Sequence, residues 1–181
     1  MVPDRRFERA RGAVFSRSGE YRYALWRRWD RSAPWVLFIG LNPSTADAEN
    51  NDPTIRRCIG FAREWQAGGV LVGNLFGWRS TDPRGLADAT DPRGPGNRRW
   101  LARLAGAAGR VIACWGNPGH GSAEARWTER RFGGLEVLAV NRGGAPRHPL
   151  YVPGGTRPRR WRAACPGQIS PSCPEPRSPA P

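Results

Sequence analysis

Two polar segments carry side chains that could act chemically on a bound molecule: Asn42-Pro43-Ser44 and Arg147-His148-Pro149. Amide and imidazole groups orient water, donate hydrogen bonds and stabilise developing negative charge. Asn74 lies between these segments in the sequence, inside an apolar run, where a buried amide must find hydrogen-bond partners. We therefore expect the two segments and Asn74 to build one functional cleft.

The cleft is expected at one edge of a sheet. Four apolar runs are typical of buried strands, and each leads into a polar or glycine-rich segment: residues 35–39, 70–76, 111–115 and 135–140. In open α/β sheets, ligands bind outside the carboxyl ends of the strands. Loops in that position are also where functional residues concentrate.

Helical patterns alternate with these runs. The first begins at Asp52-Pro53, an N-cap followed by a proline at the first helical position, and ends at Gly68-Gly69. Others cover residues 97–108 and 122–132, and an alternating pattern at residues 12–30 indicates a β-hairpin. The sequence predicts an α/β fold: a three-layer α/β/α sandwich with a short, mostly parallel sheet, preceded by the N-terminal β-hairpin.

The 181 residues are enough for one domain with a proper core. We expect a flexible N-terminus at residues 1–11, a single α/β domain at 12–156, and a disordered tail rich in proline and arginine at 157–181.

The chain is strongly basic, with a formal net charge of +14. All 29 of its basic residues are arginine. Such an excess favours an anionic partner, of which nucleic acid is the commonest. A solvated arginine-rich surface without a partner is the alternative.

Composition argues against several other classes. No apolar run approaches the roughly 20 residues that span a bilayer, and the N-terminus lacks a secretory pattern. We expect a cytoplasmic protein without membrane contact. The four cysteines form no CxxC pair, and neither His120 nor His148 has a Cys or His at metal-ligand spacing, so no metal and no cofactor are expected.

Each candidate residue also has a purely structural interpretation. The Asn42-Pro43-Ser44 segment is a favourable turn sequence, and Asn74 could bond a neighbouring loop. Asp52 is most simply a helix cap. His148 could sit in a surface turn, and Trp78 and Trp115 are more often packing residues than stacking platforms.

Five strings together resemble an uncharacterised bacterial and phage family catalogued as domain of unknown function 1643. They are GLNPSTAD (40–47), DPTIRR (52–57), GNLFGWRSTDP (73–83), CWG (114–116) and PRHPLY (146–151). The resemblance covers about residues 12–155 and implies no activity.

The order of motifs is also similar to the uracil-DNA glycosylase superfamily, whose members share an α/β/α sandwich around a short parallel sheet. Gly40-Leu41-Asn42-Pro43 resembles the motif that positions the attacking water, Asn74 the base-reading asparagine, and His148-Pro149 the late motif that contacts the base carbonyl. Ser44 replaces the usual glycine, Leu150 replaces a serine, and the cysteine set of the iron–sulfur members is absent.

This resemblance implies hydrolysis of an N-glycosidic bond. Asn42 would orient the water, His148 would stabilise the departing base, and Asp52 or Asp47 would supply a carboxylate. Asn74 would bond an extruded base and Trp78 would stack on it. Arg79 and Arg147 would hold phosphates, and Pro43, Ser44 and Trp115 complete the expected substrate-binding set.

Two alternatives remain open. One is a non-catalytic module that binds nucleic acid or a nucleotide. The other is a small-molecule hydrolase acting on a free nucleotide or nucleoside, with activity independent of polymer length. The pattern specifies no oligomeric state.

Overall fold

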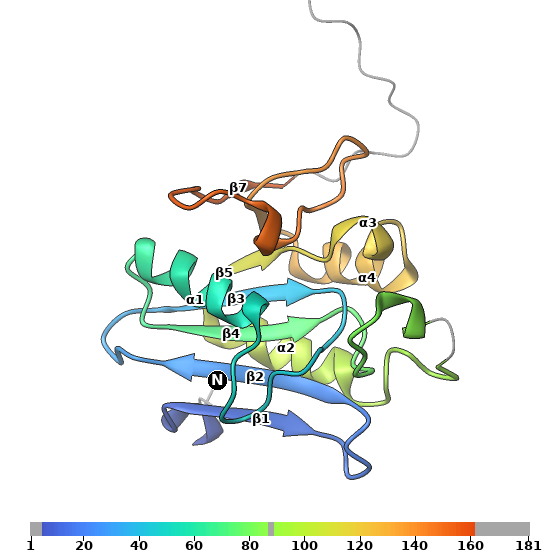
Figure 1. The fold of residues 1–181 in the computed structure, drawn as a ribbon. Helices are drawn as coiled ribbons and strands as arrows, with labels where there is room; N and C mark the ends of the chain where they lie inside the picture. The colour runs from blue at the N-terminus through green and yellow to red at the C-terminus, as the bar shows by residue number, and fades with distance from the viewer. Residues whose placement is uncertain (1–4, 87–88, 162–181) are drawn as a thin grey trace, which may run out of the picture.

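The computed structural model describes residues 5–86 and 89–161, which build a seven-stranded sheet with helices on both faces (Figure 1). The strands are β1 (Arg11–Phe15), β2 (Arg22–Arg28), β3 (Trp35–Gly40), β4 (Gly69–Asn74), β5 (Ala108–Ala113), β6 (Glu136–Val137) and β7 (Arg159–Arg160). The α-helices are α1 (Pro53–Glu64), α2 (Asn97–Ala107), α3 (Gly116–Gly119) and α4 (Ala123–Phe132). Three short 3-10 helices are η1 (Arg5–Glu8), η2 (Pro83–Leu86) and η3 (Pro149–Tyr151).

The sheet has the order β1-β2-β4-β3-β5-β6-β7. The pairs β4–β3, β3–β5 and β5–β6 are parallel, whereas β1–β2, β2–β4 and β6–β7 are antiparallel. The α/β class is confirmed, but the sheet is mixed rather than mostly parallel. The difference arises because the N-terminal hairpin joins the central sheet through β2, and the chain after η3 returns to pair with β6.

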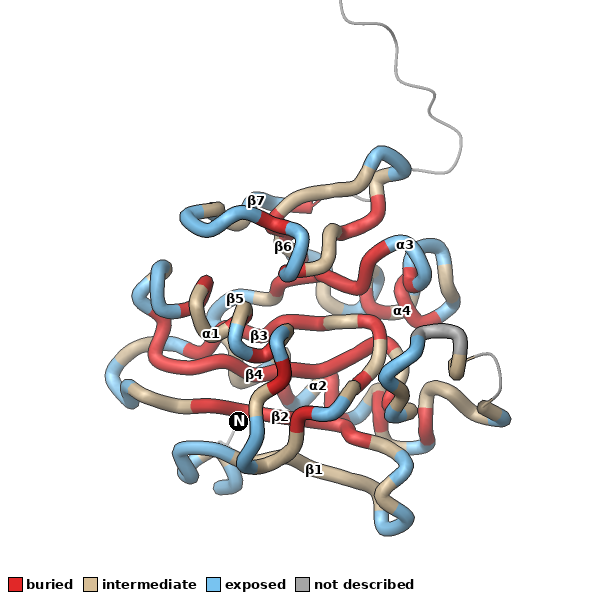
Figure 2. Tube along the Cα trace, in the orientation of Figure 1, coloured by how far each residue is buried: buried red, intermediate tan, exposed pale blue. Residues whose placement is uncertain are grey.

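Side chains alternate between the two faces of the central strands, as period-two geometry requires. Val36 and Phe38 lie in a cluster with the buried face of α1, while Leu37 and Ile39 lie in a cluster with α2. Figure 2 shows that burial is concentrated along β3 and β4. The core therefore consists of two apolar layers, one on each side of these strands.

The folded part extends beyond the domain boundaries expected from the sequence. Phe7 in η1 packs edge-on against Trp26, with ring centroids 5.5 Å apart. At the other end, β7 pairs with β6, and the buried Trp161 contacts Trp115 at 5.4 Å. Residues 5–11 and 157–161 thus belong to the fold, whereas residues 1–4 and 162–181 of the expected terminal segments lie outside the described residues.

No helix in the described ranges is long and apolar enough to cross a membrane.

Glycine substitutions test how tightly the sheet is joined to its loops. A Cβ at Gly68 would lie 2.2 Å from the Asp30 carbonyl oxygen and 2.4 Å from that of Ala33, whereas a Cβ at Gly60 meets nothing within 4 Å. We expect Gly68→Ala to lower the free energy of unfolding by about 1–3 kcal/mol, because backbone must move. The matched Gly60→Ala in α1 should raise it by about 0.4–1 kcal/mol. Urea denaturation measures both, and equal stabilities would contradict the described approach of the chain at Gly68.

Candidate functional site

A cavity of about 470 Å³ lies at the carboxyl ends of β3, β4 and β5, beside the first turns of α1. Segments far apart in the sequence meet in its wall. The sequence-predicted residues that line it are Asn42, Ser44, Asp52, Asn74, Trp115 and His148. The structure thus brings these six residues, which the sequence analysis singled out, to the wall of one cavity at this edge of the sheet.

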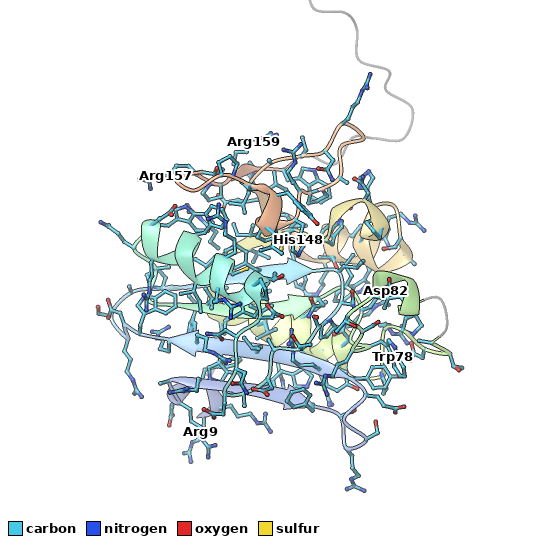
Figure 3. All side chains as sticks on the ribbon, in the orientation of Figure 1. Arg9, Trp78, Asp82, His148, Arg157 and Arg159 are labelled. Atoms are coloured by element: carbon cyan, nitrogen blue, oxygen red, sulfur yellow. The ribbon has the colours of Figure 1, made fainter. Side chains whose placement is uncertain are left out.

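The other sequence-predicted residues lie outside the cavity wall. Pro43 contributes its carbonyl oxygen to a bond from the Ser80 amide, and Trp78 packs edge-on against Tyr21 at 5.4 Å. Figure 3 shows Trp78 well away from His148. A stacking role for Trp78 on a ligand in this cavity is therefore not supported by its position.

The two arginines expected to hold phosphates make bonds within the protein. The Arg79 guanidinium lies 4.9 Å from the Phe15 ring and donates to the Gly19 carbonyl oxygen at 3.0 Å. Arg147 Nε donates to Asn141 Oδ1 at 3.0 Å. Since Asn141 lines the cavity, Arg147 positions a lining residue rather than lining the cavity itself.

Asn42 lies in the loop after β3, and its side chain is fixed by its amide nitrogen. Nδ2 donates to the Ser80 carbonyl oxygen at 2.9 Å and to the Pro43 carbonyl oxygen at 3.2 Å. Because both bonds use the nitrogen, the amide oxygen remains as the acceptor for a ligand or a water molecule. That orientation is the one required of a group that accepts a hydrogen bond from an attacking water.

Asn74, the last residue of β4, is held against β3. It is the parallel partner of Gly40, and a Cβ at Gly40 would lie 2.8 Å from Asn74 Oδ1. The Asn74 side chain is buried, and its Nδ2 has no hydrogen-bond partner. A buried amide donor without a partner is costly, so this group is suited to a ligand acceptor.

His148 precedes η3 and caps it. Its Nδ1 accepts a hydrogen bond from the Leu150 amide at 3.4 Å, which places the proton of the neutral ring on Nε2. Burial lowers the pKa of His148 below its ordinary value of 6.5, and the nearby Asp52 charge opposes this shift. At neutral pH the ring is therefore a neutral Nε2–H donor.

Asp52 is the N-cap of α1, as the Asp-Pro pair predicts. Its Oδ1 accepts a hydrogen bond from the Ile55 amide at 2.8 Å, and the residue is buried in the cavity wall. Asp47, the other carboxylate considered, accepts bonds from the Glu49 and Asn50 amides and does not line the cavity. The carboxylate beside His148 is thus that of Asp52.

Arg22 is a cavity-lining residue that the sequence pattern did not reveal. Simple alternation along β2 places Tyr23 with Leu25 and puts Arg22 on the opposite face. The observed register pairs Val14 with Ala24 and Phe15 with Arg22, so Tyr23 is an extra residue in β2. This β-bulge shifts the alternation by one residue and turns Arg22 toward the cavity face, where Leu25 also lies.

Arg22 is almost fully buried there. Its Nη1 donates to the Ala46 carbonyl oxygen at 2.5 Å, while its Nε has no hydrogen-bond partner. Burial lowers the pKa of Arg22 to about 10, and the charge of Asp52 opposes that shift. The guanidinium is therefore a cation at neutral pH.

Two further lining residues missed by the pattern are Cys58 and Cys114, both free and buried. Burial raises the pKa of Cys114 to about 12 and that of Cys58 well above its ordinary value. Because the thiolate is the reactive form, neither side chain is a nucleophile at neutral pH. Within residues 5–86 and 89–161, no group of three or more His, Cys, Asp or Glu residues could hold a metal ion.

Comparison with known proteins places the chain in a family. Residues 22–150 match the model of a protein family of unknown function, DUF1643. The chain belongs to this family. No curated protein and no solved structure matches it.

Substitutions of Asp52 separate its structural role from its charge. Asp52→Asn keeps an oxygen for the Ile55 amide, so we expect Asp52→Ala to be about 1 kcal/mol less stable than Asp52→Asn. Both changes remove a negative charge that raises the pKa of His148, so that pKa should fall further in each. NMR titration of the two imidazoles measures this, with the exposed His120 as internal reference. An unchanged His148 pKa in both variants would contradict the electrostatic coupling.

Proposed function

We propose that this cavity binds a nucleobase and hydrolyses its N-glycosidic bond, as in the uracil-DNA glycosylase superfamily that the motifs resemble. The observation that carries the proposal is the convergence of Asn42, Asn74 and His148 on one cavity. Each comes from a different loop or strand end, and each presents a different group: an amide oxygen, an unpartnered amide nitrogen and a neutral imidazole donor.

The reaction assigns roles to Asn42, His148 and Asp52, while Asn74 bonds the edge of the base. A water molecule held by the Asn42 amide oxygen attacks the sugar carbon, and its oxygen forms the new bond to that carbon. The bonding electron pair of the N-glycosidic bond leaves with the base, whose developing negative charge is stabilised by the Nε2–H of His148. The proton released from the water passes to the Asp52 carboxylate, which faces the same cavity.

Polymeric nucleic acid is the preferred substrate in this proposal. Leu150 and Tyr151, directly after His148-Pro149, are 45% and 75% exposed, and Tyr151 also lines the cavity. Apolar and aromatic side chains at a cavity mouth can replace the stacking that a base loses when it leaves a helix. Leu150 occupies the position at which the uracil-DNA glycosylase superfamily has a serine. An apolar contact to the base would therefore replace the polar contact that a serine makes.

Base release tests the hydrolytic role. Oligonucleotides carrying uracil, mismatched thymine or hypoxanthine would be incubated with the protein under single-turnover conditions and then cleaved with alkali. We expect release from at least one of them, reduced about 10²–10³-fold by Asn42→Ala and by His148→Ala, because each removes a group aimed at the transition state. His120→Ala is the matched control, since His120 is exposed and lies outside the cavity wall.

The outcome against hydrolysis is equally specific. If no substrate releases a base while the wild type binds oligonucleotides in a salt-dependent manner, the chain is a binding module. If only free nucleosides or nucleotides are hydrolysed, the protein is a small-molecule hydrolase.

The exposed pair Leu150 and Tyr151 separates polymer from monomer substrates. We expect Leu150→Ala combined with Tyr151→Ala to weaken binding of a base-containing oligonucleotide by about tenfold, because stacking contributes about 1–3 kcal/mol per base. Binding of the matching free nucleoside should change less than the polymer's. Fluorescence anisotropy measures the first and isothermal titration calorimetry the second. Equal losses for both ligands would contradict a role for the pair in holding a polymer.

A further inference from the structure

Two residues of the cavity wall carry a buried side-chain nitrogen donor without a partner, Arg22 at Nε and Asn74 at Nδ2. Arg22 is 3% exposed and Asn74 4% exposed, so solvent does not satisfy either group. Of these two donors, the proposed function uses only Asn74 Nδ2, which bonds the base, and it gives no role to Arg22. The bond from Arg22 Nη1 to the Ala46 carbonyl oxygen supports the loop before α1, but it leaves the buried Nε without a partner, which is costly.

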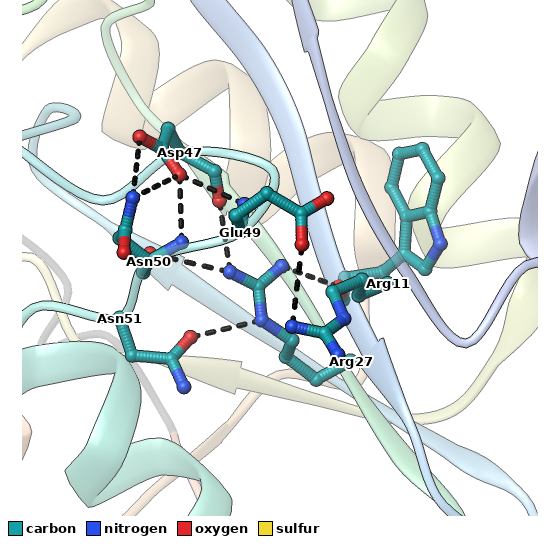
Figure 4. A network of polar contacts seen from close by, with 7 residues as sticks. Arg11, Arg27, Asp47, Glu49, Asn50 and Asn51 are labelled. Atoms are coloured by element: carbon teal, nitrogen blue, oxygen red, sulfur yellow. Dashed lines mark hydrogen bonds and ion pairs between the residues drawn. The ribbon is translucent and has the colours of Figure 1, made fainter.

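Arg27, a second buried arginine on β2, provides a comparison, because all of its side-chain nitrogens bond the protein itself. Arg27 is 7% exposed, and all three of its nitrogens donate hydrogen bonds (Figure 4). Nε bonds Asn51 Oδ1 at 2.8 Å, Nη1 bonds the Trp26 carbonyl oxygen at 2.8 Å, and Nη2 bonds the carbonyl oxygens of Asp47 and Asn50. Arg22, in contrast, retains an unused N–H at Nε, on a residue that lines the cavity.

The unpartnered groups share one hydrogen-bonding character. Among described residues of the cavity wall, the buried side-chain atoms without a partner are Arg22 Nε, Asn74 Nδ2 and Trp115 Nε1, and all are donors. The ring of Trp115 packs on Trp161 in the cluster on the α2 face, so we do not assign its Nε1 to a ligand. The two donors that remain need a ligand edge made of acceptors only.

The charges around Arg22 favour a negative edge. Two carboxylates in the loop before α1, Asp52 and Asp47, attract the Arg22 guanidinium electrostatically. Two other guanidiniums repel it, those of Arg27 on β2 and of Arg79 in the loop after β4. Together with Arg22 itself, these charges leave one positive charge in excess. Hydrogen bonds from a charged donor to an anion are about twice as strong as neutral ones, so an anion gains most from this arrangement.

We infer that Arg22 and Asn74, two buried residues of the cavity wall, form an oxyanion-binding site, which takes a ligand edge carrying negatively charged oxygen. Such an edge has two sources, the ionised ring of a base and the phosphate of a free nucleotide. The inference rests on the proposed function insofar as the first source is a nucleobase. It adds a charge requirement that the motif residues do not impose.

Matched ligands of opposite charge test the site. The probes are 5-nitrouracil, whose ring ionises readily, against uracil, and 2′-deoxyuridine 5′-monophosphate against 2′-deoxyuridine. Dissociation constants would be measured at pH 7.5 by NMR or calorimetry for the wild type, Arg22→Gln and Arg27→Gln. Thermal unfolding of each variant would establish that it is folded.

We expect the wild type to bind one anionic probe about tenfold or more tightly than its neutral partner, because hydrogen bonds to charged groups are stronger than those between neutral groups. Arg22→Gln should abolish that preference, whereas Arg27→Gln should keep it even where it lowers stability. The ionised base and the nucleotide phosphate are distinguished by which pair shows the preference. If Arg22→Gln does not fold, Asn74→Asp replaces a donor by a repelling carboxylate and should lose the anionic probe by a similar factor.

Equal binding of charged and neutral probes by the wild type would overturn the inference, as would an anion preference that survives in Arg22→Gln. These outcomes are independent of base release. An Arg22-dependent anion preference without release from any oligonucleotide would leave the oxyanion site standing and overturn only the hydrolysis.

Discussion

The parallel register of β3 and β4 sets the positions of the two amides, Asn42 and Asn74, in the cavity wall. It pairs Gly40 with Asn74, so the last residue of one strand lies beside the last residue of the next. A Cβ at position 40 would lie only 2.8 Å from Asn74 Oδ1. Because Gly40 has no side chain, the Asn74 amide can pack closely against the backbone of β3. The loops after β3 and β5 then leave the sheet at the same edge, as in other parallel arrangements. Without this register, Asn42 and Asn74 would not line one cavity.

The N-terminal hairpin supports the loop that carries Asn42 and Asp52. From β2, Arg22 bonds the Ala46 carbonyl oxygen, and Arg27 bonds carbonyl and amide oxygens of residues 47, 50 and 51 (Figure 4). Backbone groups in a loop that is not part of a helix or sheet need partners, and the two guanidiniums supply them. The hairpin is therefore more than an extension of the sheet, since it fixes the loop between β3 and α1.

The sequence predicted the parts of the site that depend on local chemistry. The Asp-Pro pair identified the start of α1, and the polar ends of apolar runs identified the edge at which Asn42, Asn74 and His148 meet. It did not predict Arg22, because a one-residue bulge in β2 changes which face each side chain occupies and leaves no mark in the alternation. The pairing of β7 with β6 was missed for a similar reason, since a strand of two arginines carries no apolar pattern.

The two basic side chains of the cavity wall respond differently to burial. Burial lowers the pKa of Arg22 only to about 10, so its charge is constant at neutral pH, while burial keeps His148 neutral there. Arg22 thus stays a cation at neutral pH, and His148 is the basic group in the wall whose charge changes as the pH falls. Protonation of His148 would add a second cation and leave its Nδ1 unable to accept from the Leu150 amide. Protonation of His148 therefore adds positive charge to the cavity wall and removes the acceptor that caps η3, so the charge of the wall and the positioning of η3 are coupled through one imidazole.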